Sequence, residues 1–316
     1  MAVETTTFSN NSADTWFRDI MFDCVLCPRA CHVNRLAGQT GYCGQTAELM
    51  AARASLHYWE EPCISGTSGS GTVFFSGCNL RCVFCQNHNI ALGKAGRVIA
   101  PEHLAEIFLQ LQEQGANNIN LVTPTHFLPQ IVIALEQAKQ QGLHLPIVYN
   151  TGSYESPEAL RHLEGLVDIY LPDLKYFSPE LSTAYSHAPD YLETACAAIS
   201  EMYRQVGDPV IDEDTGLMQH GMIVRHLLLP GQTKDSKKIL RYLHETYGDH
   251  IYISIMNQYT PLPQVADIEV LNRTVTPEEY DRVLRFAERI GIERGFRQEG
   301  TAASESFIPE FDERGL

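Results

Sequence analysis

The sequence predicts an α/β fold: a partial (β/α)6 TIM-like barrel preceded by an N-terminal cysteine-rich metal-binding module. Six short apolar segments alternate with helix-like segments, and such alternation produces a parallel sheet with right-handed crossovers. Six units are too few to close an eight-fold barrel, so we expect an open, curved sheet. Seven of the nine cysteines fall in two close groups, which indicates metal binding and not a disulfide scaffold.

The chain divides into four predicted parts. Residues 1–20 are polar and aperiodic, which predicts a flexible arm, and residues 21–66 hold the cysteine-rich module. The barrel is expected over 67–299, and residues 300–316 are expected to form a C-terminal surface extension. Hydrophobic residues make up 44% of the chain, which is ample for a core.

Residue patterning predicts each element of the barrel in turn. Apolar or β-branched runs mark the strands, while proline at the first turn or glycine at the end bounds several helices. The strands are expected at 72–75, 118–122, 146–149, 167–171, 222–229 and 251–255. The helices are expected at 100–115, 128–141, 156–166, 178–207 (partly broken), 235–247 and 277–290. Residues 47–61 are expected to form a strand or hairpin that leads into the barrel.

Composition excludes several classes of function. The net charge of −16 and the pI near 5.1 argue against a general nucleic-acid binder or a binder of anionic membranes. No run of 18 apolar residues occurs, so no membrane-spanning segment is expected. The first residues lack the basic start and apolar stretch of a signal peptide. Together with clustered cysteines, this predicts a cytoplasmic protein.

The most specific motif is Cys78-x3-Cys82-x2-Cys85, in a loop that follows the first predicted strand. Nine cysteines in 316 residues give roughly 0.007 occurrences of this spacing by chance. Three thiolates on one loop suit an iron–sulfur cluster or zinc. Because a four-iron cluster has four corners, three ligands leave one corner open for another molecule.

A second group, Cys24-x2-Cys27-x3-Cys31-x11-Cys43, places four thiolates within 20 residues. Four ligands close a metal site, as in structural zinc sites or in a second four-iron cluster. The spacing does not choose between these two alternatives.

These motifs resemble the radical S-adenosylmethionine (radical SAM) superfamily, whose signature loop corresponds to Cys78, Cys82 and Cys85. The sequences Cys24-Val-Leu-Cys-Pro-Arg29 and Tyr170-Leu-Pro-Asp-Leu-Lys-Tyr176 resemble more closely the relatives of the pyruvate formate-lyase activating enzyme. The resemblance implies a catalytic [4Fe–4S] cluster and bound S-adenosyl-L-methionine. It also implies reductive cleavage to a 5′-deoxyadenosyl radical, which abstracts hydrogen from a substrate.

By the same resemblance the protein is expected to be a glycyl-radical-enzyme activase that takes its electron from a donor such as flavodoxin or ferredoxin. Radical modification of a peptide or small metabolite is the first alternative. A non-catalytic iron–sulfur electron carrier is the second, because the Gly-Gly-Glu segment of many superfamily members is missing here.

Functional side chains of parallel β/α folds gather at the carboxyl ends of the strands. The cofactor is therefore expected to contact five residues at predicted strand ends, Thr123, Thr125, Asn150, Asp173 and Lys175, and also Arg225, which lies inside the predicted strand 222–229. For Asp173 and Lys175 this role is what the resemblance to the activating enzymes implies. The two threonine carbonyls are expected to replace Gly-Gly-Glu, and His126 either faces this site or lies at its rim. Arg225 must be paired, with the cofactor carboxylate preferred and Asp173 or another acid as the alternative.

Overall fold

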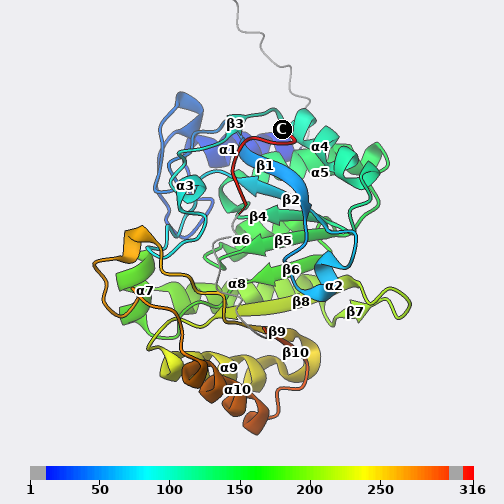
Figure 1. Cartoon of the computed structure of the whole chain (residues 1–316). Helices are drawn as coiled ribbons and strands as arrows, with labels where there is room; N and C mark the ends of the chain where they lie inside the picture. The colour runs from blue at the N-terminus through cyan, green and yellow to red at the C-terminus, as the bar shows by residue number, and fades with distance from the viewer. Residues whose placement is uncertain (1–11, 299–308) are drawn as a thin grey trace, which may run out of the picture.

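A ten-stranded sheet forms the centre of the protein in the computed structural model, which describes residues 12–298 and 309–316. Its order is β10-β9-β8-β6-β5-β4-β2-β1-β3, with β7 paired to β8 outside this path. Neighbours from β2 to β10 run parallel, whereas β1, β3 and β7 pair antiparallel. Because β3 and β10 end the path at opposite edges, the sheet is not closed (Figure 1).

The strands are β1 Met50–His57, β2 Ser70–Phe75, β3 Arg97–Val98, β4 Ile119–Val122, β5 Ile147–Thr151, β6 Ile169–Pro172, β7 Val210–Ile211, β8 Met218–Leu227, β9 Tyr252–Met256 and β10 Gly295–Arg297. The α-helices are α1 Ser12–Phe22, α2 Pro62–Ser65, α3 His88–Ala91, α4 Pro101–Glu113, α5 Leu128–Gln140, α6 Pro157–Leu160, α7 Pro179–Ser186, α8 Tyr191–Val206, α9 Thr233–Tyr247 and α10 Pro277–Ile290. No helix of the described residues combines the length and apolar character that crossing a bilayer requires.

The six predicted strands correspond to β2, β4, β5, β6, β8 and β9, so the α/β prediction of an open parallel sheet is confirmed. The structure adds β10 at one edge, β3 at the other, and β7 beside β8. The predicted strand or hairpin at 47–61 is the single strand β1, which pairs antiparallel with β2. Strand β8 begins at Met218, four residues before the predicted start, because β7 pairs with its first half.

Local signals set the helix ends. In α4, Pro101 occupies the first turn and the apolar face is buried. In α10, Thr276 and Glu279 form a reciprocal capping box. The predicted helical region 178–207 is two helices, because His187 adopts a left-handed φ of 51° and Pro189 follows it. The predicted helix 156–166 is reduced to α6 and one 3-10 turn.

The segment predicted as a flexible arm, residues 1–20, is helical in the part that the structure describes. Residues 1–11 lie outside the described part of the chain, but α1 begins at Ser12. Trp16 of this helix stacks on His162 with ring centroids 3.7 Å apart, and Met21 is fully buried. The polar residues at the start of the segment gave no indication of this short amphipathic helix, because a helix of this length is stabilised by tertiary packing.

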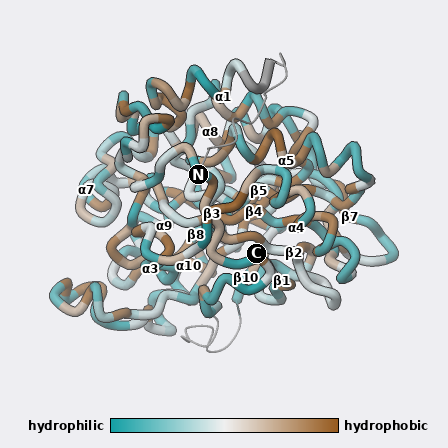
Figure 2. Tube along the Cα trace, turned by 90° about the horizontal axis from the view of Figure 1, so that it is seen from above, coloured by the Kyte–Doolittle hydropathy of each residue, from teal (hydrophilic) through white to brown (hydrophobic). Residues whose placement is uncertain are grey.

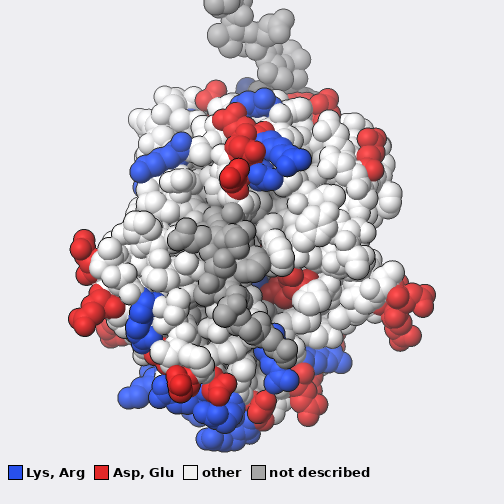
Figure 3. All heavy atoms as spheres, viewed as in Figure 1, with Lys and Arg blue, Asp and Glu red and all other residues white. Residues whose placement is uncertain are grey.

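The core lies along the sheet. Every residue of β2, β4, β5 and β6 is buried, and the central strands are hydrophobic while many outer loops are hydrophilic (Figure 2). Strands buried on both faces are typical of parallel sheets covered by helices. On the face shown in Figure 3, Lys and Arg gather near α9 and α10 with Asp and Glu among them.

The predicted C-terminal extension is described only over residues 309–316, which return to β1. The amide of Ala54 donates to the carbonyl of Arg314, and Arg53 forms an ion pair with Asp312 at 2.9 Å. Phe311 packs edge-on against Phe74 of β2 at 5.4 Å. This end of the chain therefore lies on the surface but is anchored to the sheet.

Candidate active site

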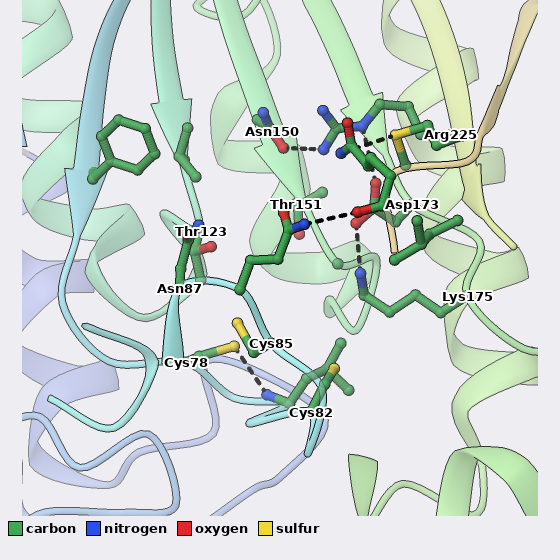
Figure 4. A pocket seen from close by; sticks show the side chains of 18 of the residues that line it. Cys78, Cys82, Cys85, Asn87, Thr123, Asn150, Thr151, Asp173, Lys175 and Arg225 are labelled. Carbon is green, nitrogen blue, oxygen red and sulfur yellow. Dashed lines mark hydrogen bonds and ion pairs between the residues drawn. The ribbon is translucent and has the colours of Figure 1, made fainter. Parts of the chain in front are cut away.

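A cavity of about 430 Å³ opens where the parallel strands end. Its walls are the loop after β2 and the ends of β4, β5, β6, β8 and β9 (Figure 4). Cavities of this size hold small-molecule ligands and cofactors, and active sites of parallel β/α folds lie at this edge of the sheet. We call it the main cavity.

The loop after β2, residues 77–87, brings three thiols to the main cavity and is called the cysteine loop. Gly77 turns the chain with a φ of 92°. A Cβ at this position would lie 2.9 Å from the carbonyl oxygen of Cys43 and 2.5 Å from the Gln45 side chain. Only glycine therefore permits the loop to pass this close to the N-terminal module.

Cys78, Cys82 and Cys85 all line the main cavity (Figure 4). The amide of Leu80 donates to Cys78 Sγ at 3.4 Å, and the hydroxyl of Ser186 donates to Cys82 Sγ at 3.0 Å. Hydrogen bonds to sulfur favour its thiolate form. The structure thus brings together the three predicted catalytic cysteines on one wall.

The three thiols fit the cluster that their spacing predicts. Burial raises the pKa of Cys78 and of Cys85, and a bound metal reverses this because it deprotonates a coordinating thiol. Among the described residues, no three His, Cys, Asp or Glu side chains already surround one point as ligands of a single ion do. Ligands of a multi-iron cluster bind different irons, so they need only face one space.

Opposite the thiols, two acids and two bases form a buried charged group (Figure 4). Asp173 Oδ2 lies 2.6 Å from Lys175 Nζ, and Asp173 Oδ1 accepts from Arg225 Nε at 2.9 Å. Arg225 Nη1 donates to Glu60 Oε2 at 3.0 Å, and Nη2 donates to Asn150 Oδ1 at 2.5 Å. The formal charges of this group cancel, which permits its burial.

Arg225 has partners within the protein in this structure. Its guanidinium pairs with Asp173, the alternative partner, and with Glu60, while its contact with the cofactor carboxylate stays a prediction. The neighbouring His226 points to the opposite side of β8, where its ring contacts the Leu174 carbonyl and the Ser236 hydroxyl. Because successive side chains of a strand point to opposite faces, only one of Arg225 and His226 can face the main cavity.

The remaining predicted cofactor residues, Thr123, Thr125 and Asn150, also line the main cavity. Thr123 holds a left-handed φ of 56° at the end of β4, and its amide donates to the carbonyl of Asn150. Strained backbone of this kind is often found at binding sites. The Thr125 hydroxyl instead donates to Glu155 at 2.6 Å.

The sequence gives no indication that two acids, Glu155 and Glu60, lie at the site. Glu155 is fully buried and accepts hydrogen bonds from Thr125 and Thr151, both of which line the main cavity. Burial raises the pKa of Glu155 to about 7. No motif marks Glu155 in the sequence, and the Glu60-Glu61-Pro62 segment gives no sign that Glu60 meets Arg225, 165 residues away.

The four N-terminal cysteines face a second, smaller space, which we call the thiol cavity. It measures about 10 Å³, close to the volume that one water molecule occupies. Cys24, Cys27, Cys31 and Cys43 line it as free thiols, together with Arg35 and His126. His126 therefore faces this cavity and not the main one. The two lone cysteines, Cys63 and Cys196, lie elsewhere; Cys63 packs in a small apolar cluster.

Comparison with known proteins gives three findings. The family model of the Radical SAM superfamily matches residues 72–243, more than half of the chain. A protein of Methanocaldococcus jannaschii named MJ0674 is 27% identical over 286 residues, which cover 87% of this chain and 77% of that protein. The pyruvate formate-lyase-activating enzyme of Clostridium pasteurianum is 29% identical over 121 residues, which cover 36% of this chain and 48% of that enzyme.

Among solved structures, a domain of pyruvate-formate lyase-activating enzyme from Bacteroides vulgatus is similar with a TM-score of 0.42 and 14% identity. The match covers 58% of this chain and 100% of that domain. The family match spans β2, the cysteine loop and every later strand as far as β8, so it includes all three thiols and the charged group except Glu60.

Proposed function

This chain belongs to the radical SAM superfamily, and from that premise we propose that it reductively cleaves S-adenosylmethionine and uses the radical to take hydrogen from a substrate. One observation carries the proposal: the three thiols and the charged group face each other across a single cavity. Within the described residues no fourth cysteine lines that cavity, so a four-iron cluster held there keeps one corner for a ligand.

Cys78, Cys82 and Cys85 would hold the cluster. When bound, it supplies the electron that breaks a sulfur–carbon bond of S-adenosylmethionine. The side chains around it have the complementary task of binding, orienting and excluding water. Leu80, Phe84 and other apolar side chains line the same space and would help to exclude water once the co-substrate is bound.

Charge supports a cationic co-substrate beside the thiols. An oxidised four-iron core with three thiolates carries one net negative charge, and one-electron reduction makes it two, whereas S-adenosylmethionine carries one net positive charge. The protein's own charged group is already neutral, because Asp173 and Glu60 balance Lys175 and Arg225. The pair of bound groups would therefore leave the buried site neutral while the cluster is oxidised, and the cationic co-substrate would offset part of the charge of the reduced cluster.

The amino group of the co-substrate needs acceptors. We propose the backbone carbonyls at Thr123 and Thr125, which stand at the end of β4 where the Gly-Gly-Glu segment is missing. The left-handed turn at Thr123 supports this role, because it sets the direction of the backbone at the cavity wall. Asn150 and Asp173 offer further oxygen acceptors on the same wall.

For the substrate we propose a glycine residue of another protein, which makes the chain a glycyl-radical-enzyme activase with a flavodoxin- or ferredoxin-type electron donor. Its support is the similarity to the pyruvate formate-lyase-activating enzyme over 121 residues. A peptide or small metabolite is the alternative substrate. Anaerobic pull-down with the wild-type protein distinguishes them, since only an activase captures a protein whose glycine, when labelled with deuterium, passes that deuterium to 5′-deoxyadenosine.

The test of the proposed chemistry compares the wild type with Cys82→Ala under anaerobic conditions. After reconstitution with iron and sulfide, wild type is expected to form 5′-deoxyadenosine when dithionite is added, and Cys82→Ala only a background amount. Cys196→Ala is the matched control, because this half-buried thiol lies outside the main cavity. Equal 5′-deoxyadenosine formation by wild type and Cys82→Ala contradicts the proposal.

A non-catalytic iron–sulfur electron carrier makes a different prediction. Such a protein would hold iron but would not bind S-adenosylmethionine. Calorimetric titration of the reconstituted wild type with S-adenosylmethionine is expected to show saturable binding. Iron-loaded protein that releases no heat at any concentration up to a millimolar would favour the carrier.

A further inference from the structure

The thiol cavity of the N-terminal module is built around its sulfur atoms. Cys31 Sγ accepts a hydrogen bond from the amide of Tyr42 at 3.3 Å. At Gly41 the chain passes so close that a Cβ would lie 2.8 Å from Cys31 Sγ. Amides directed at sulfur are typical of thiolate centres.

A buried cation at this cavity has no carboxylate partner. Arg35 is only 1% exposed, and its guanidinium donates to the carbonyls of Thr46 and His126. In the described part of the chain it takes part in no ion pair with Asp or Glu. Because an uncompensated buried charge is costly, a negative charge is expected beside it. Thiolates on a metal supply that charge.

The ring of His126 is the second sign of a ligand. Its Nε2 lies 2.7 Å from the carbonyl oxygen of Ser76, which accepts only, so Nε2 carries the proton. Nδ1 therefore has a free lone pair, and it is buried without any hydrogen-bond partner. Histidines that bind metals commonly donate their other nitrogen to a backbone carbonyl in this way.

The module is also fastened to the cysteine loop. Arg29, between two of its cysteines, donates from Nε to the Asn79 carbonyl at 2.9 Å and from Nη2 to the Ser186 carbonyl at 2.9 Å. The Ser186 hydroxyl is the donor to Cys82 Sγ. The Tyr42 hydroxyl reaches the Leu80 carbonyl at 3.5 Å. In Figure 1 the N-terminal module and the loop before α3 lie side by side.

We propose that Cys24, Cys27, Cys31 and Cys43 bind a second metal centre through their thiolates, and that this centre holds the cysteine loop in place. Either a zinc ion or an iron–sulfur cluster satisfies the shared chemistry, since four thiolates give both a net negative charge beside Arg35. The thiols must rotate to close the site. Binding of this metal orders Arg29 and Tyr42, which contact the loop that carries Cys78 and Cys82.

The first experiment removes the cysteine loop's thiols, so its outcome does not depend on the proposed function. The variant Cys78→Ala/Cys82→Ala/Cys85→Ala is purified anaerobically, supplied with zinc or with iron and sulfide, and analysed for metal. It is expected to keep about one zinc or about four irons per chain, with X-ray absorption showing mainly sulfur ligands at about 2.3 Å. Adding Cys27→Ala and Cys31→Ala is expected to abolish this metal, whereas adding Cys196→Ala is not.

Thiol alkylation checks the same site without removing its ligands. In the triple variant, the four module cysteines are expected to resist iodoacetamide until a chelator is added. A triple variant that binds neither metal, or one that keeps its metal after loss of Cys27 and Cys31, overturns the proposal. Equal alkylation of the four thiols with and without metal does so as well.

The second experiment tests the coupling between the two centres, and this half rests on the proposed function. Arg29→Gln is expected to lose iron from the cysteine loop to a chelator about tenfold faster than wild type, because hydrogen bonds to the loop are lost. Arg289→Gln, on the exposed side of α10, is the control. Equal rates in wild type and Arg29→Gln overturn the coupling while leaving both metal sites standing.

Discussion

Replacement of Arg225 by methionine tests the buried charged group of the main cavity. Methionine keeps much of the apolar stem but removes the guanidinium, which hydrogen-bonds Asp173, Glu60 and Asn150. Asp173 retains Lys175 at 2.6 Å. Glu60 retains only amide donors, from Asn120 and Asn150. The substitution therefore leaves Glu60 as a buried acid without a cation.

The expected cost follows from this burial. Breaking a buried ion pair by removing one partner costs about 3–5 kcal/mol, and the lower end applies here because the side chains of Glu60 and Asp173 are 10% and 15% exposed. The double variant Arg225→Met/Glu60→Gln is expected to regain about half of that loss, since it removes the unpaired charge as well. Arg285→Met, which breaks the exposed pair with Asp281, is expected to cost less than about 0.5 kcal/mol.

The cost is also expected to depend on pH. Burial favours the neutral acid at Asp173, but Lys175 and Arg225 outweigh it and lower the pKa of Asp173 below its ordinary value. An acid whose pKa is lowered by folding stabilises the protein above its unfolded pKa, and this contribution is lost as the pH falls. The difference between wild type and Arg225→Met is therefore expected to shrink below about pH 4.

Urea unfolding at pH 7 and at pH 3 measures these differences, with the slope of the transition used to confirm that the unfolded states are comparable. A loss below about 1 kcal/mol for Arg225→Met at pH 7 would refute the reasoning, because the group would then behave like a surface ion pair. The same holds if the added Glu60→Gln change makes the protein still less stable.

Three further predictions concern neighbouring positions. Burial raises the pKa of Glu155 to about 7, so its neutral form contributes stability that is fully present below the unfolded pKa and is lost as the pH rises through 7. Glu155→Gln should remove this pH dependence, which amounts to up to about 3 kcal/mol in the free energy of unfolding measured by urea titration at several pH values. Thr123→Gly should stabilise the protein by up to about 1 kcal/mol, because glycine adopts the left-handed φ without strain. Calorimetry should show an affinity for S-adenosylmethionine within a few-fold of wild type, because the proposed acceptor is a backbone carbonyl. Loss of binding would contradict the role of that carbonyl. Gly77→Ala should lower the free energy of unfolding in urea by more than about 2 kcal/mol, because the added Cβ clashes with the Cys43 carbonyl. Gly165→Ala is the control: it has a similar φ but no neighbour within 4 Å, and it should cost only about 1 kcal/mol. Equal costs would mean that the cysteine loop and the N-terminal module are not in tight contact.

Short-range patterns were enough to predict most of the fold. Six strands and their intervening helices follow from apolar runs and helix-end signals, which act within a few residues. The exceptions were elements stabilised by distant partners. Helix α1 depends on the stacking of Trp16 on His162, and β10 depends on pairing with β9. Neither partner is visible in the local pattern.

The sequence by itself determined that Cys78, Cys82 and Cys85 share one loop, and local chain geometry is enough to bring these three candidate ligands to one cavity. Tertiary structure alone decided the partners of the charged and polar side chains. Arg225 hydrogen-bonds Glu60, which lies 165 residues away in the sequence, and His126 lines the thiol cavity instead of the main cavity. The physical reason is that sheet pairing, and not sequence separation, sets which strand ends become neighbours.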